Sequence, residues 1–143
     1  MVSRLGIYIC SALIGILFII PGMIKTIRIS TGIHKEIIKK YKNFTEVSPF
    51  VKIGLDVSPI VYMQMTGVFE IILGTILVAG TVSFKRFACL GLISIVLLVA
   101  YNQFALEDYR AMIVPLGYFV LLSWIFHCLG RLSCSCAKHL KHD

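Results

Sequence analysis

The chain has 143 residues, of which 58% are hydrophobic and 15% charged, and its formal net charge is +7. A mean hydropathy of +0.90 excludes an ordinary soluble domain, because so short a chain cannot bury that much apolar surface in one core. The basic residues are spread through the polar segments without interleaved aromatics, which excludes nucleic acid as a partner. These values favour a membrane protein with several spans.

The first apolar run, residues 5–24, predicts a membrane-spanning helix. It contains no charged residue and is long enough to cross a hydrocarbon core of about 30 Å. A signal peptide would have a shorter apolar region, of about 7–15 residues, followed by a small-residue cleavage site. This run ends instead in the segment 21–25, PGMIK. We therefore expect an uncleaved first span that ends at Lys25.

The polar segment that follows, residues 25–58, contains a predicted amphipathic helix over about 31–46. Its apolar residues at positions 33, 37, 38, 41 and 44 share one helical face, and its lysines fall largely on other faces. Such a helix either lies on the lipid headgroups or folds over the mouth of the bundle. Asn43 begins a glycosylation sequon, NFT, which is usable only if this segment is lumenal.

The second apolar run, residues 59–82, has a single ionisable residue, Glu70, near its middle. An ionisable group at that depth costs roughly 2.5–3.5 kcal/mol, so a lipid-facing helix would not keep it. Gly67, Glu70 and Gly74 share one helical face, where the glycines let a neighbouring backbone approach and cover the carboxyl group. We expect this face to contact a partner. The alternative is a protonated carboxyl group that only joins two helices of the bundle.

Two further apolar runs, residues 87–106 and 111–130, predict the third and fourth spans. The links between the last three spans are short, so consecutive spans should be antiparallel neighbours. The predicted fold is therefore an all-α membrane protein, a four-transmembrane-helix up-down bundle that forms a single domain over residues 1–143.

Several polar side chains should converge in the half of the bundle nearest the long polar segment. Asn102 and Gln103 end the third span, and Gln64 and Glu70 lie in the second span on the same side. Lys25 ends the first span there. Because Glu70 lies about 11 residues, roughly 16 Å, beyond the start of its span, a direct ion pair with Lys25 is strained unless the first span runs deeper. Otherwise a water molecule or an amide must bridge the two.

The five cysteines predict no disulfide framework, since none lies in the long polar segment. Cys134 and Cys136 follow the last span and are candidates for reversible palmitoylation. The same pair is also conceivable as a redox or metal pair, but free thiols beside the membrane are the simplest interpretation. The sequence has no second buried acid, no ligand cluster and no nucleophile–base pair, so we predict no catalytic residue, no metal and no cofactor.

The charge distribution along the chain bears on the orientation of the protein in the membrane. Six basic residues fall on the side of the termini and eight on the side of the long polar segment. The long segment spreads its charge far from either span, so it weighs less in the positive-inside rule. Together with the Asn43 sequon, this favours termini in the cytosol.

Three segments resemble the DoxX-like family of four-helix membrane proteins. They are Phe18-x-x-x-Gly22-x-x-Lys25, Gly67-x-x-Glu70-x-x-x-Gly74 and Asn102-Gln103. Within that family the chain is most similar to the animal branch of nicotinic acetylcholine receptor chaperones, the NACHO branch, and its small paralogue. The resemblance covers residues 5–129 and includes the segment 42–49. Two departures, Asn102 in place of that branch's histidine and an end at Asp143 without its long polar tail, place the chain nearer the paralogue.

The resemblance implies a multi-pass protein of the endoplasmic reticulum membrane with cytosolic termini. Such a protein is a chaperone that assists the folding and assembly of pentameric ligand-gated channels, such as nicotinic acetylcholine receptors, without ATP and without a catalytic step. Its partners would be membrane lipids and unassembled channel subunits. The residues that we expect to form the partner-binding surface are Gly22, Lys25, Gly67, Glu70, Gly74, Asn102 and Gln103.

The alternative function is a DoxX-type redox or quinone-linked membrane subunit. In that case Glu70 would handle a proton, and Cys134 and Cys136 would exchange electrons. The lack of a C-x-x-C motif counts against this alternative. A simpler interpretation is a structural scaffold without client specificity.

Overall fold

The computed structural model describes residues 3–27 and 30–139, which are helical over most of their length. The helices in chain order are α1 (Arg4–Thr26), α2 (Thr31–Val47), α3 (Pro49–Lys52), α4 (Pro59–Ala79), α5 (Val82–Ala105) and α6 (Tyr109–His139). The described residues form no strand, and α1, α4, α5 and α6 are each long and apolar enough to cross a membrane. The predicted class, an all-α multi-pass membrane protein with four spans, is confirmed.

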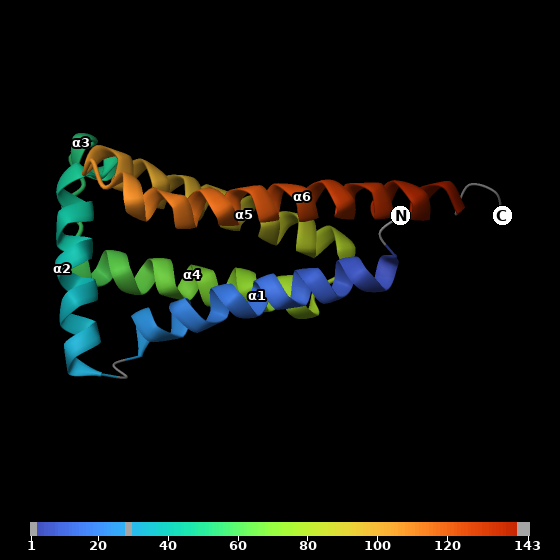
Figure 1. Ribbon diagram of the computed structural model, residues 1–143, viewed down its shortest axis with the longest axis horizontal. Coiled ribbons are helices and arrows are strands. Elements are labelled where there is room, and N and C mark those ends of the chain that lie inside the picture. The colour runs from blue at the N-terminus through green and yellow to red at the C-terminus, as the bar shows by residue number, and fades with distance from the viewer. Residues whose placement is uncertain (1–2, 28–29, 140–143) are drawn as a thin grey trace.

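The four long helices form two pairs, α1 with α4 and α5 with α6, and α2 lies across one end of both pairs (Figure 1). The two ends of the chain lie at the opposite end of the bundle (Figure 1). Near the chain ends the pairs pack around a shared core that includes Ile14, Leu77, Leu92 and Leu122. Toward α2 the two pairs separate (Figure 1), and the candidate site lies between them there.

Facing glycines bring α1 and α4 into close contact. A Cβ atom added to Gly22 would lie 2.8 Å from the carbonyl oxygen of Gly67, and one added to Gly74 would lie 2.8 Å from that of Gly15. Real side chains do not tolerate such distances to a backbone atom, so only glycine allows this approach. Each pair of glycines along one helix is seven residues apart, so the contact recurs after two turns.

The amphipathic helix α2 covers the end of the bundle. It spans Thr31–Val47, close to the predicted range of 31–46, and its lysines are exposed. Tyr41 and Phe44 are buried and pack against Met63 of α4. Of the two placements that the sequence allowed, the structure therefore shows the helix folded over the mouth of the bundle.

The link between the second and third spans is shorter than predicted. The second apolar run was expected to reach residue 82, but α4 ends at Ala79, and α5 begins already at Val82 after its N-cap residue Thr81. Lys85 and Arg86 therefore belong to the start of α5 instead of the link. At the other end of the chain, α6 continues well beyond the predicted end at residue 130.

Candidate functional site

Glu70 of α4 faces α1 and forms an ion pair with Lys25. The Lys25 Nζ atom donates a hydrogen bond to Glu70 Oε1 over 2.6 Å. The two side chains are 17% and 6% exposed, so protein shields both charges. The direct pair forms under the condition stated above, because Lys25 lies deeper in the bundle than the start of α4, and no bridging water molecule or amide is needed.

The glycine contact explains the depth of Lys25. A Cβ atom added to Gly67 would lie 3.0 Å from Lys25 Cβ and 2.8 Å from Thr26 Oγ1. The end of α1 is therefore level with Gly67, less than one turn from Glu70. The estimate of roughly 16 Å assumed that α1 and α4 end at the same depth, but α4 extends about two turns farther, toward α2.

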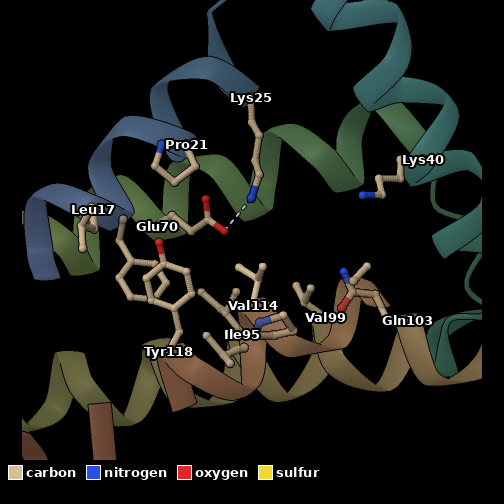
Figure 2. Close-up of a pocket in the computed structure, with 14 residues that line it drawn as sticks. Leu17, Pro21, Lys25, Lys40, Glu70, Ile95, Val99, Gln103, Val114 and Tyr118 are labelled. Carbon is tan, nitrogen blue, oxygen red and sulfur yellow. Dashed lines mark hydrogen bonds and ion pairs between the residues drawn. The ribbon is translucent and has the colours of Figure 1, made fainter. Parts of the chain in front are cut away.

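The ion pair lies in the wall of a cavity of about 510 Å³ between the two helix pairs. In this Glu70 cavity, Lys25 and Glu70 lie on one side and Gln103, Val114 and Tyr118 lie on the other (Figure 2). Most of the remaining lining is aliphatic. Leu17 of α1 and Val114 of α6 both line the cavity and are 45% and 61% exposed, so the cavity opens to the surrounding lipid between α1 and α6.

Two acceptor atoms in the lining of the Glu70 cavity are buried and have no hydrogen-bond partner among residues 3–27 and 30–139. They are Glu70 Oε2 and Gln103 Oε1. The residues are only 5% and 7% exposed. An unpaired buried acceptor costs about 1–3 kcal/mol, so a group that donates a hydrogen bond inside this cavity would be stabilised.

Tyr41 connects α2 to the ion pair. Lys25 Nζ lies 5.9 Å from the centre of the Tyr41 ring. Burial raises the pKa of the Tyr41 phenol above its ordinary value, while the Lys25 charge acts in the opposite direction. The phenol is therefore neutral at physiological pH, and α2 closes the polar end of the site with an uncharged aromatic ring.

The predicted glycine face lies inside the bundle. Gly67 and Gly74 are buried against Gly22 and Gly15 of α1. The structure therefore corrects the expectation that this glycine face meets a partner directly, because the chain's own first helix occupies it. Of the predicted face, only Glu70 reaches a cavity.

The amide side chains do not all converge as predicted. Gln103 lines the Glu70 cavity, whereas Asn102 points to the other side of α5 and donates a hydrogen bond to the Tyr62 hydroxyl over 3.3 Å. Gln64 is exposed, so its predicted convergence with Glu70 was wrong. It lies six residues before Glu70, which rotates it by about 240° around the helix axis.

Lys85 is a buried polar residue that sequence reasoning missed. It is 2% exposed, and its Nζ donates hydrogen bonds to Ser11 Oγ over 3.0 Å and to the Val78 carbonyl oxygen over 3.3 Å. Nζ also lies 4.7 Å from the centre of the Tyr8 ring. Lys85 therefore ties α1, α4 and α5 together near the chain ends, and no sequence motif marked it.

The predicted modification sites lie on exposed parts of the chain. Asn43 is exposed on α2, and Cys134 is exposed near the end of α6. The side chain of Cys136 lies outside the described part of the structure. In the ranges that the structure describes, no group of three or more His, Cys, Asp or Glu residues is placed to hold a metal ion.

No protein-family model matches the chain. An ion pair shielded by helices lies beside an apolar cavity that opens to lipid, and two unpaired acceptors line that cavity. This arrangement can bind a polar group that is presented from within the membrane.

Proposed function

We propose that this protein is a chaperone of the endoplasmic reticulum membrane. It assists the folding, assembly and surface delivery of pentameric ligand-gated channels such as nicotinic acetylcholine receptors. The resemblance of its three motifs to the NACHO branch supports this proposal. The structural observation that carries it is the Glu70 cavity, whose lining includes two buried acceptors without partners in the described part of the chain and side chains exposed at the outer surface.

An unassembled channel subunit has polar groups in the membrane that this cavity can bind. Its transmembrane helices expose small and polar interface residues to lipid, where polar groups lack hydrogen-bond partners. A subunit helix that lies against α1 and α6 can place one donor through the mouth between Leu17 and Val114. Glu70 Oε2 and Gln103 Oε1 would accept hydrogen bonds from that donor.

The strength of such a contact suits a transient complex. Hydrogen bonds between membrane helices contribute on the order of 0.6–2 kcal/mol each. The next channel subunit offers a larger interface and therefore displaces the chaperone. No nucleotide or covalent step is required, because binding of the next subunit supplies the free energy for release.

Blocking the mouth of the Glu70 cavity should abolish the chaperone effect. The test uses cells that express the receptor and lack this protein. Each of the single variants Val114→Trp and Glu70→Gln should give a surface receptor level at least about fivefold below the level that the wild type restores. Radiolabelled toxin binding on intact cells measures surface receptor. Ile113→Trp is the matched control, because Ile113 is 71% exposed on the same helix and does not line the cavity. If both Trp variants rescue equally, the client does not use this cavity.

The redox alternative gains no support from where the cysteines lie in the fold. The exposed Cys134 lies near the C-terminal end of α6, whereas Lys40 of α2 lines the Glu70 cavity. The C-terminal end of α6 and α2 lie at opposite ends of the bundle (Figure 1). We expect the double variant Cys134→Ser, Cys136→Ser to retain full receptor rescue. A loss of rescue in this double variant, with normal protein levels, would favour the redox alternative.

The proposed orientation places the chain ends in the cytosol and α2 in the lumen. When only the plasma membrane is permeabilised, a membrane-impermeant maleimide should label Cys134. The buried Cys89 should remain unlabelled, and Cys134→Ser, Cys136→Ser should abolish the signal. Digestion with an endoglycosidase should shift the mobility of the wild type but not of Asn43→Gln. If Cys134 is labelled only when the membrane of the endoplasmic reticulum is also permeabilised, the orientation is the opposite of the one proposed.

A further inference from the structure

A second cavity, of about 420 Å³, lies between α4 and α5 beneath α2 and α3. Aromatic side chains from α2, α3 and α4 surround it, among them Phe44, Phe50 and Phe69. Ile95 and Val99 of α5 separate it from the Glu70 cavity, since both residues line both spaces. The second cavity is therefore a distinct site, and we call it the aromatic cavity.

The aromatic cavity opens to lipid. Met65 and Phe69 belong to its lining and are 52% and 50% exposed. These two side chains lie on the face of α4 that does not contact α1, so a lipid molecule can reach the cavity sideways from the bilayer.

One buried polar atom in the lining lacks a partner. Asn102 is 0% exposed and lines the aromatic cavity. Its Nδ2 donates to Tyr62, but its Oδ1 has no hydrogen-bond partner in the described part of the chain. A buried amide oxygen requires a donor, because leaving it unpaired costs about 1–3 kcal/mol.

The chemistry of the lining restricts the head of the ligand. None of the lining residues is charged, so a phosphate, carboxylate or ammonium group would be desolvated there without compensation. A neutral hydroxyl group supplies the missing donor without that penalty.

The depth of Asn102 agrees with the place of such a head group. Asn102 lies in the last turn of α5, near the end of the span, whereas Leu98 and Ile95 lie about 6 and 10 Å deeper along the helix. The polar atom is therefore near the membrane interface, and the apolar walls extend toward the membrane centre. This is how a membrane lipid with a hydroxyl head is oriented.

The geometry points to a binding site for a neutral membrane lipid whose head is a hydroxyl group, held by Asn102 Oδ1 between α4 and α5. Both sterols and diacylglycerols have this chemistry. The site is independent of the proposed chaperone function, which uses the Glu70 cavity on the other side of α5.

The test uses the full-length protein in phosphatidylcholine nanodiscs with photoreactive analogues of cholesterol and of diacylglycerol. Crosslinks mapped by mass spectrometry should fall on residues 61–69 of α4 and 95–102 of α5. Unlabelled cholesterol should compete about tenfold better than cholesterol methyl ether, which cannot donate the hydrogen bond. In the same way, diacylglycerol should compete about tenfold better than its methyl ether, in which the hydroxyl group is blocked. The competition experiment that shows this preference, with the sterol or with the diacylglycerol, identifies the class of lipid that the site binds.

Two Trp variants keep the test specific to the cavity. Met65→Trp fills the mouth and should reduce crosslinking about tenfold, whereas Ile72→Trp should not. Ile72 is 49% exposed on the same helix and does not line the cavity. Size-exclusion profiles verify that both variants are folded. Equal competition by the hydroxyl-blocked lipids in both arms, crosslinks outside these segments, or equal effects of the two Trp variants would overturn the proposal.

Discussion

Replacing Lys25 with Met should destabilise the protein by about 3 kcal/mol or more, and replacing Lys25 and Glu70 together should restore most of that loss. The single change leaves the Glu70 carboxylate buried without its counter-ion, which is strongly unfavourable. The double variant Lys25→Met, Glu70→Leu removes both charges and fills the space with apolar atoms. Reversible unfolding in mixed micelles measures the free energies of unfolding.

The matched control for Lys25→Met is Lys39→Met. Lys39 is exposed on α2 and does not line the Glu70 cavity, so its replacement should change stability by no more than about 0.5 kcal/mol. If the Lys25 and Lys39 variants are equally stable, or if the double variant is less stable than the single variant, the buried ion pair does not exist.

The double variant also separates stability from function. Because it is folded but lacks the Glu70 acceptor in the cavity, it should fail to restore surface receptor in cells. A role of Glu70 only as a link between helices would instead leave the double variant as active as the wild type. This comparison distinguishes a partner site from the simpler alternative that the sequence left open.

Gly74→Leu should destabilise the protein by about 3 kcal/mol, because it forces α1 and α4 apart. Even the first carbon atom of a side chain there would lie 2.8 Å from the Gly15 carbonyl oxygen and 2.9 Å from Ile19 Cγ1. The backbone of α1 must shift to admit it, and overpacking of this kind costs about 1–3 kcal/mol or more. Reversible unfolding in mixed micelles also measures the free energy of unfolding of this variant.

Gly117→Leu provides the control for the glycine prediction. Gly117 lies in α6, is exposed, and a Cβ atom added there meets nothing within 4 Å. The substitution should be neutral or stabilise α6 by up to about 1 kcal/mol, since leucine favours helix more than glycine does. Equal destabilisation by both substitutions would mean that the α1–α4 contact is not close-packed.

The sequence predicted the spans well because the length of an apolar run and the cost of a charge within it can both be read from a single segment of the chain. The same reasoning identified Glu70 as a residue that protein must cover, and α1 does cover it. What covers it depends on where α1 and α4 cross. The facing glycines set that crossing, and Gly15 was overlooked although its seven-residue spacing from Gly22 matches that of Gly67 and Gly74.

Other features of the site could not be predicted for similar reasons. The depth of Lys25 follows from how far α4 extends past α1, a relation between two helices that no single segment specifies. The burial of Lys85 depends on Ser11 and Val78, which come from two other helices. Asn102 and Gln103 are adjacent in sequence, so the helix directs them to different sides of α5, and each lines a different cavity.

The glycine correction changes where a partner is expected to bind. A partner cannot pack on Gly67 and Gly74 while α1 occupies them, so the contact moves to the lateral mouth of the Glu70 cavity. There a client needs only one polar side chain to reach Glu70 and Gln103. The proposed recognition therefore depends on the space between the helix pairs instead of on the glycine face.

The proposed function requires that a channel subunit reaches into the Glu70 cavity between α1 and α6. The most direct measurement places a photoreactive amino acid at position 114, or at position 113 as the control, in cells that express the receptor subunits. We expect a crosslink from position 114 to the unassembled subunit, its loss in the folded double variant Lys25→Met, Glu70→Leu, and little crosslinking from position 113. Equal crosslinking from both positions, or a crosslink from position 114 that persists in this double variant, would show that the subunit does not use the cavity.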